Sequence, residues 1–191
     1  MVLEIFVEIC IQNPKAVNKA RAELDSVIGP KRLPSFSDKD NCPYINAFIL
    51  ELLRRHPISP FGVPHMVTQD DEYMGYRIPA GTIIVANQMG MNMDETIFEN
   101  PEKFESDRYM QNVDLPHPAT FGFGRRQCPG HHIARANLFI VISRLLWGYD
   151  IHQHEQADTD NKFAVSSDKA LFVVRSDEHR KTIENAAVEE K

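Results

Sequence analysis

The N-terminal third of the chain carries apolar residues at helical spacing. Residues 2–12, VLEIFVEICIQ, predict a helix that starts without a polar capping residue. Asn13 and Pro14 then mark the start of a second helix, whose apolar positions recur over residues 17–28 until a Gly-Pro pair ends it. A third helix is predicted over residues 43–55, because its apolar side chains share one face and prolines follow it.

The middle of the chain changes to short segments typical of strands. Val63–Thr68, Glu72–Tyr76 and Thr82–Ala86 are predicted strands, and the turn Pro79-Ala80-Gly81 is expected to join the last two. Residues 87–120 are expected to be mostly irregular, with one short helix near residues 94–98.

The last third combines a long helix with a hairpin. The helix is predicted over residues 129–147, and Phe163–Ser166 is expected to pair with Leu171–Arg175 around residues 167–169. The charged residues 177–191 are expected to form a frayed or weakly helical tail. The whole pattern predicts one domain over residues 1–191, mainly α with small β-sheets, in the α+β class.

Composition narrows the function classes. The chain is 42% hydrophobic and 25% charged, which is ordinary for a globular protein, and its net charge of −6 argues against nucleic-acid binding. Three widely spaced cysteines make no disulfide framework, and Cys10 and Cys42 are interpreted as structural. The apolar run at residues 2–11 is too short for a membrane span, which needs about 20 apolar residues.

The segment Phe121–Gly130, FGFGRRQCPG, carries the strongest chemical signal. Its single cysteine, Cys128, stands among glycines directly before a predicted helix, whose N-terminal N–H groups favour thiolate over thiol. Such a thiol suits an axial ligand on iron, and the glycines let the backbone turn beside a flat macrocycle. Arg126 supplies a cation for a propionate or another carboxylate.

This segment resembles the haem-binding loop of the cytochrome P-450 superfamily, F-x-x-G-x-R-x-C-x-G, at all five fixed positions. The resemblance implies a haem-thiolate monooxygenase, which uses O2 and electrons from NADPH–cytochrome P-450 reductase or an equivalent donor to hydroxylate an organic substrate. It also implies haem b as the cofactor, Cys128 as the metal ligand, and a cofactor-binding set of Cys128, Arg126, His65, Phe121, Gly122 and Gly130.

The residues of the same segment suggest two other metal sites. Cys128 and His131 could be two zinc ligands, but structural zinc needs four, and no second pair has suitable spacing. A covalent c-type haem is less supported, since the sequence has no C-x-x-C-H motif.

Two further segments resemble the same superfamily. Glu51 and Arg54, three residues apart, would by themselves suggest a surface ion pair, but ELLRRHP resembles the family's E-x-x-R helix. PEKFESDRY resembles its P-x-x-F-x-P-x-R-F segment, although Ser106 replaces the proline and Tyr109 the phenylalanine. The resemblance implies that Glu51, Arg54 and Arg108 form a buried structural triad.

The resemblance also gives roles near the predicted strands. His65 is either a strand-edge residue or, as the family suggests, a contact to a haem propionate. Residues 58–63 and 168–171 match segments that line the family's substrate pocket, and their small apolar side chains suggest a small apolar substrate.

The sequence contains no A-G-x-D/E-T stretch, which in the family carries the oxygen-activating acid and alcohol. Residues 2–12 resemble the end of that helix, so the chain is expected to be the C-terminal portion of a eukaryotic, microsomal-type member, lacking the N-terminal half. A full-length relative would lie in the endoplasmic reticulum membrane, whereas this chain, without an anchor, would be cytoplasmic. The alternative is a catalytically inactive remnant or interaction fragment, with or without haem.

Overall fold

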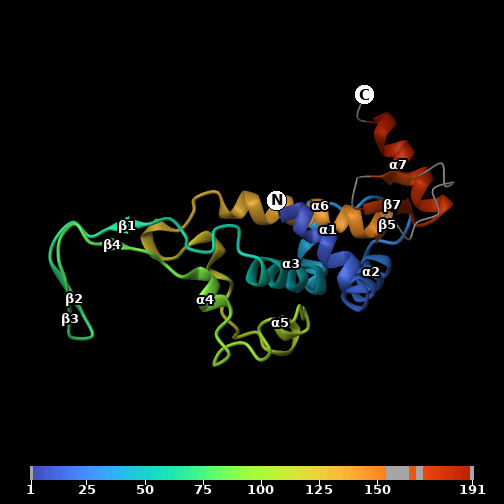
Figure 1. Cartoon of the computed structure of the whole chain (residues 1–191). Helices are drawn as coiled ribbons and strands as arrows, with labels where there is room; N and C mark the ends of the chain where they lie inside the picture. Colours follow the sequence, from blue (N-terminus) through green and yellow to red (C-terminus); the bar gives the residue numbers. More distant parts are fainter. Residues whose placement is uncertain (1, 154–163, 167–169, 190–191) are drawn as a thin grey trace.

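A computed structural model describes residues 2–153, 164–166 and 170–189 of the chain. It is mainly helical with small antiparallel sheets, so the predicted fold class is confirmed. Four helices form the body in Figure 1: α1 (Val2–Gln12), α2 (Pro14–Val27), α3 (Pro43–Arg55) and α6 (His131–Gly148). A short 3-10 helix, Phe36–Asn41, precedes α3.

The core lies where α2, α3 and α6 meet. On α3, Ile45, Phe48 and Leu52 recur at helical spacing and are buried. They pack with fully buried residues of the other helices, among them Leu24 on α2 and Trp147 on α6. Burial of a large apolar side chain contributes about 1.5–3 kcal/mol, so this shared core holds the elements that carry the candidate site.

A β arm, residues 61–86, extends away from the helical body (Figure 1). In it β1 (His65–Met66) pairs with β4 (Ile83–Ile84), and β2 (Asp71–Tyr73) pairs with β3 (Tyr76–Ile78). The expected pairing of residues 72–76 with 82–86 is therefore wrong. Met74 and Gly75 both have positive φ, 52° and 83°, as a tight two-residue hairpin turn requires, so the chain reverses earlier than expected.

The segment after the arm also differs from the prediction. The short helix is α4 (Gln88–Asn92), not residues 94–98, because the Asn87 side chain accepts a hydrogen bond from the Gly90 amide and starts it. Residues 94–98 form a turn instead. Three further short helices follow in the loop beneath α3 and before α6: α5 (Arg108–Gln111), Ala119–Phe121 and Gly124–Arg126.

The C-terminal part forms a three-stranded antiparallel sheet in the order β5-β7-β6. The expected hairpin is confirmed as β6 (Ala164–Ser166) and β7 (Ala170–Val174), and its turn, 167–169, lies outside the described residues. Strand β5 (Tyr149–Gln153) was not predicted. The tail, expected to be frayed or weakly helical, contains helix α7 (Asp177–Glu189), which packs on α6 through the rings of Trp147 and His179.

Candidate functional site

The loop before α6, residues 121–130, carries the thiol of Cys128 and is called the thiol loop below. Gly122 has φ 70° and ψ −168°, a conformation that only glycine adopts without strain, and Gly124 also has positive φ. The Cys128 amide donates to the Phe121 carbonyl at 2.8 Å, which closes the loop. A side chain at Gly122 would therefore oppose the loop shape that places Cys128 ahead of α6.

Cys128 differs from the other two cysteines by its exposure. Cys10 and Cys42 are buried in the core, and this burial raises the pKa of the Cys10 thiol to about 12 and that of the Cys42 thiol to about 11. Cys128 is exposed at the N-terminal end of α6, and a Cβ placed on Gly130 would lie 3.9 Å from its sulfur. The chain thus offers one accessible thiol beside the positive end of a long helix.

The two basic residues predicted to contact haem are also exposed. Arg126 lies in the thiol loop and His65 on β1, and neither side chain has a hydrogen-bond or ion-pair partner within the part of the chain that the structure describes. No such contact joins His65 to the loop. The structure therefore places Arg126, Cys128, Gly122 and Gly130 in one loop and leaves His65 on the arm.

Phe121 has neighbours that the sequence did not indicate. It is half-buried against the core, and the Arg135 guanidinium lies 5.6 Å from its ring centroid. The His131 ring lies 6.4 Å away and its Nδ1 contacts the Cys128 carbonyl at 2.8 Å. In the sequence, the contact of Arg135 with Phe121 could be anticipated only from the position of Arg135, one helical turn after His131 on α6.

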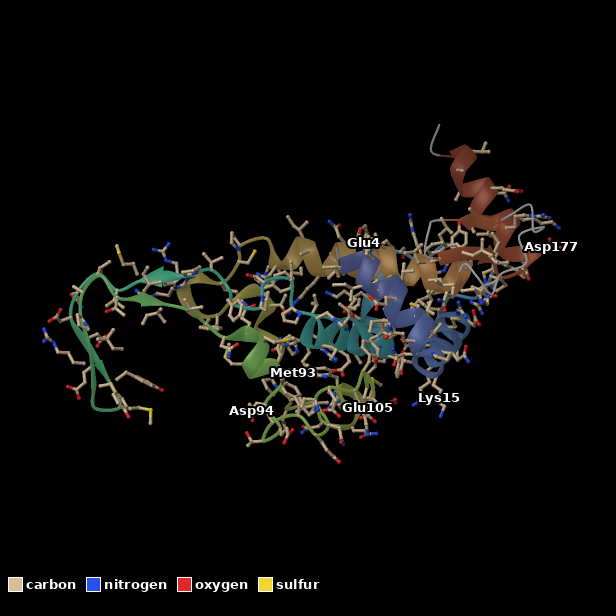
Figure 2. All side chains as sticks on the ribbon, in the orientation of Figure 1. Glu4, Lys15, Met93, Asp94, Glu105 and Asp177 are labelled. Atoms are coloured by element: carbon tan, nitrogen blue, oxygen red, sulfur yellow. The ribbon has the colours of Figure 1, made fainter. Side chains whose placement is uncertain are left out.

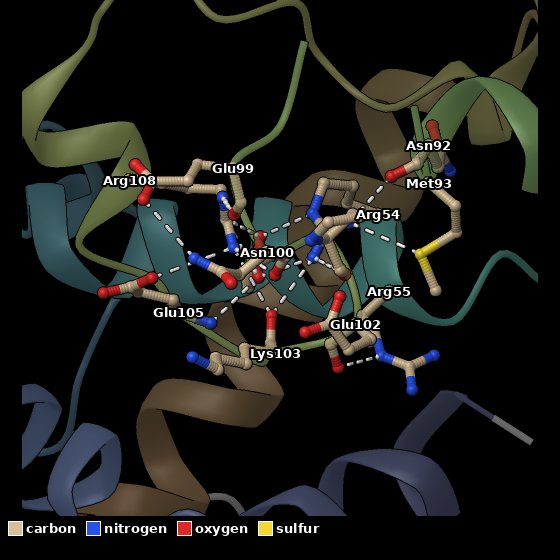
Figure 3. Close-up of polar contacts among 12 residues, drawn as sticks. Arg54, Arg55, Asn92, Met93, Glu99, Asn100, Glu102, Lys103, Glu105 and Arg108 are labelled. Atoms are coloured by element: carbon tan, nitrogen blue, oxygen red, sulfur yellow. Dashed lines mark hydrogen bonds and ion pairs between the residues drawn. The ribbon is translucent and has the colours of Figure 1, made fainter. Parts of the chain in front are cut away.

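The structure brings the three residues of the predicted triad together near the end of α3. Figure 3 shows Arg54 and Arg108 among their polar contacts. Arg54 donates to both Glu51 oxygens at 2.9 and 2.8 Å, and Arg108 Nε lies 3.2 Å from the same carboxylate. The Glu105 amide donates to it at 2.9 Å. Glu51 and Arg54 are 0% exposed, so the solvent-exposed ion pair that a lone E-x-x-R would suggest is excluded.

Arg54 reaches further than the triad. It donates to the carbonyls of Asn92 and Pro101, both at 2.7 Å, and its N–H lies 3.7 Å from the Met93 sulfur. Figure 2 shows Met93 where the chain leaves α4 and Glu105 further along the loop below α3. Arg54 therefore ties α4 and the loop after it to α3. Sequence reasoning missed these acceptors because backbone carbonyls carry no sequence signal.

The end of α3 is joined directly to the thiol loop. Thr120, the residue before Phe121, donates a hydrogen bond from its Oγ1 to the Leu53 carbonyl at 3.0 Å. The buried pair Glu51–Arg54 and the loop that presents Cys128 thus share one helix as their support.

The structure shows less of the segments predicted to line a substrate pocket. On the segment expected to line a substrate pocket, Phe61 and Val63 are exposed, while 168–169 lie outside the described residues. The described ranges hold no cluster of three or more His, Cys, Asp or Glu that could bind a metal ion, and none of their helices is long and apolar enough to cross a bilayer.

Comparisons with known proteins agree on one family. The sequence model of the family Cytochrome P450 matches residues 1–176. "Cytochrome P450 monooxygenase FrzL" from Cladobotryum sp is 44% identical over 96% of this chain, and "Cytochrome P450 monooxygenase drtD" from Aspergillus calidoustus is 48% identical over 84% of it. A solved zebra fish cytochrome P450 with abiraterone superposes with a TM-score of 0.76 at 28% identity, covering 91% of this chain.

The matches cover much less of the relatives. The chain spans 38% of the FrzL sequence, 30% of drtD and 42% of the zebra fish structure. Since the family match covers most of this chain, and both the sequence and the three-dimensional comparisons lead to the same family, the chain belongs to the cytochrome P-450 family.

Proposed function

We propose that this chain forms the cysteine-bearing portion of a haem-thiolate monooxygenase, in which Cys128 is the axial ligand of haem iron. The observation that carries the proposal is the single exposed thiol of Cys128, held by a glycine-dependent loop at the start of α6. The family's named fungal relatives, at 44% and 48% identity, are monooxygenases, which supports the same reaction class.

The donor set suits haem. A thiolate ligand needs an accessible sulfur and a positive local potential, and Cys128 has both exposure and the N-terminal end of α6. Arg126 and His65 are exposed hydrogen-bond donors without internal partners in the described ranges, so they are free to contact propionates. Gly130 keeps the backbone beside the sulfur free of a side chain, and Gly122 does the same beside the backbone of Arg126 and Gln127.

When bound, haem would supply the reduction of O2 and the transfer of one oxygen atom to an organic substrate. The protein's own residues would do four things. Cys128 would hold the iron, Arg126 and His65 would orient the propionates, and Phe121 would shield the sulfur from water. Glu51, Arg54 and Arg108 would keep the loop in place and take no part in proton transfer.

The proposal extends to partners. We propose electrons from NADPH–cytochrome P-450 reductase or an equivalent donor, a small apolar substrate, and an endoplasmic reticulum address for the full-length relatives. The exposed apolar side chains near Phe61 and Val63 support the apolar character of the substrate.

The test is a reduced-minus-oxidised spectrum with carbon monoxide, recorded on the chain expressed with haem supplied. A Soret band at the thiolate-specific position, present in the native chain and absent from Cys128→Ala, is the expected result. The matched control is Cys42→Ala, which removes a buried thiol and should leave the band position unchanged. Folded protein without that band, or a band that survives Cys128→Ala, would refute the assignment.

A further inference from the structure

Helix α3 begins without a cap of its own. Its N-cap residue is Cys42, whose side chain makes no capping hydrogen bond, and Pro43 occupies the first helical position. The next two amides, Tyr44 and Ile45, would lack acceptors, since the first N–H groups of a helix have no partner within it. At this buried position, unpaired amides would be costly.

A carboxylate from another helix fills this gap. Glu23 on α2 accepts from the Tyr44 amide with one oxygen at 2.8 Å and from the Ile45 amide with the other at 2.9 Å. Both contacts are charge-assisted and lie at the positive end of α3. The two oxygens bind two successive amides, so they fix the position of α3 relative to α2 as well as satisfying the donors.

The other end of the same helix carries the site. Thirteen residues make up α3, and near its end Glu51 binds the Glu105 amide while the Leu53 carbonyl accepts from Thr120, directly before the thiol loop. A shift of α3 along its axis would move both contacts together, because a hydrogen-bonded helix transmits displacement along its length.

We infer that Glu23 is a positioning residue: by holding the start of α3 against α2, it sets where α3 places the Glu51–Arg54 pair and the loop that carries Cys128. The consequence of the Glu23 contacts for haem binding rests on the proposed function above, whereas their effect on the position of α3 does not. Sequence reasoning gave no hint of this, since Glu23 is one charged residue among several on a predicted amphipathic helix.

The experiment is amide hydrogen exchange on the haem-free chain, comparing the native sequence with Glu23→Gln. The Gln side chain keeps one oxygen that can accept from an amide of α3, but its NH2 group faces the other amide and cannot accept. Exchange at Tyr44 and Ile45 should become about tenfold faster, the effect of losing one hydrogen bond to a charged group. Exchange at Glu105 and Cys128, whose amides bond to Glu51 and Phe121, should become about threefold faster if the shift is transmitted.

The matched control is Lys15→Gln, which removes a charge about two helical turns earlier on α2. The Lys15 side chain is exposed, so exchange at Tyr44 and Ile45 should not change. Glu23→Asp is a second variant: its shorter side chain keeps the charge but does not reach both amides, so it should act like Glu23→Gln.

Two other results of the hydrogen-exchange experiment would overturn the inference. Faster exchange confined to Tyr44 and Ile45 would make Glu23 a local cap only. Equal acceleration of core amides on α6, such as Phe139 and Ile142, would show general destabilisation rather than positioning. The thiolate-specific Soret band tests the haem assignment separately: its absence from the native chain would refute the proposed function and leave the exchange result intact.

Discussion

Replacing Glu51 by Gln tests the buried triad most directly. The carboxylate is 0% exposed and accepts from Arg54, Arg108 and the Glu105 amide. An amide of the same shape loses the charge and turns an N–H group toward guanidinium donors, which leaves two buried cations uncompensated. Breaking a buried ion pair in this way costs about 3–5 kcal/mol, whereas an exposed pair contributes about 0–1 kcal/mol.

The assay is urea unfolding followed by the fluorescence of Trp147, the single tryptophan, which is fully buried. With a urea dependence of about 2 kcal/mol per molar, Glu51→Gln should lower the unfolding midpoint by about 2 M. Glu105→Gln is the control, because Glu105 is 53% exposed and lies 3.9 Å from Arg108. It should shift the midpoint by at most about 0.5 M. Equal shifts for the two variants would refute the reasoning.

Two further predictions concern the thiol loop and α7. Gly122→Ala forces a side chain into φ 70°, ψ −168° and should cost about 1–3 kcal/mol of unfolding free energy. Gly130→Ala, at φ −83°, should cost less, and urea titration that ranks the two in reverse would contradict this. Burial, and then the charge of Arg175, lower the pKa of His179. The unfolded chain therefore binds more protons below about pH 6.5, and stability should fall as pH drops through that range. His179→Gln should weaken this dependence of Tm on pH, and an unchanged dependence would contradict the assignment to His179.

The helices were the part of the fold that the sequence predicted well. Their apolar periodicity and the proline at the start of α2 and α3 are local signals, and the structure has the helices at nearly the expected residues. Strand pairing was predicted less well, because the turn at Met74 and Gly75 gave a weaker signal than Pro79-Ala80-Gly81. Strand β5 was missed because its alternation, with Asp150 and His152 as polar positions, is only five residues long and follows helix α6 directly.

The candidate site was predictable only as far as its side chains form a motif. Cys128, Arg126 and the residues of the triad could be proposed from the sequence because the family motifs name residue types at given spacings. The acceptors of Arg54 and the role of Glu23 depend on backbone groups brought close by tertiary packing, so no pattern of residue types reports them. The exposure of His65 on the arm likewise follows from the placement of a whole hairpin.

The unequal burial of the three thiols has a practical consequence. A mild alkylating or chromogenic thiol reagent at neutral pH would modify one cysteine per native molecule and three per denatured molecule, because Cys10 and Cys42 stay protonated inside the core. The ratio of the two readings measures the fraction of correctly folded chains in a preparation. The same selectivity would allow a fluorophore to be attached at the start of α6 without any engineered cysteine.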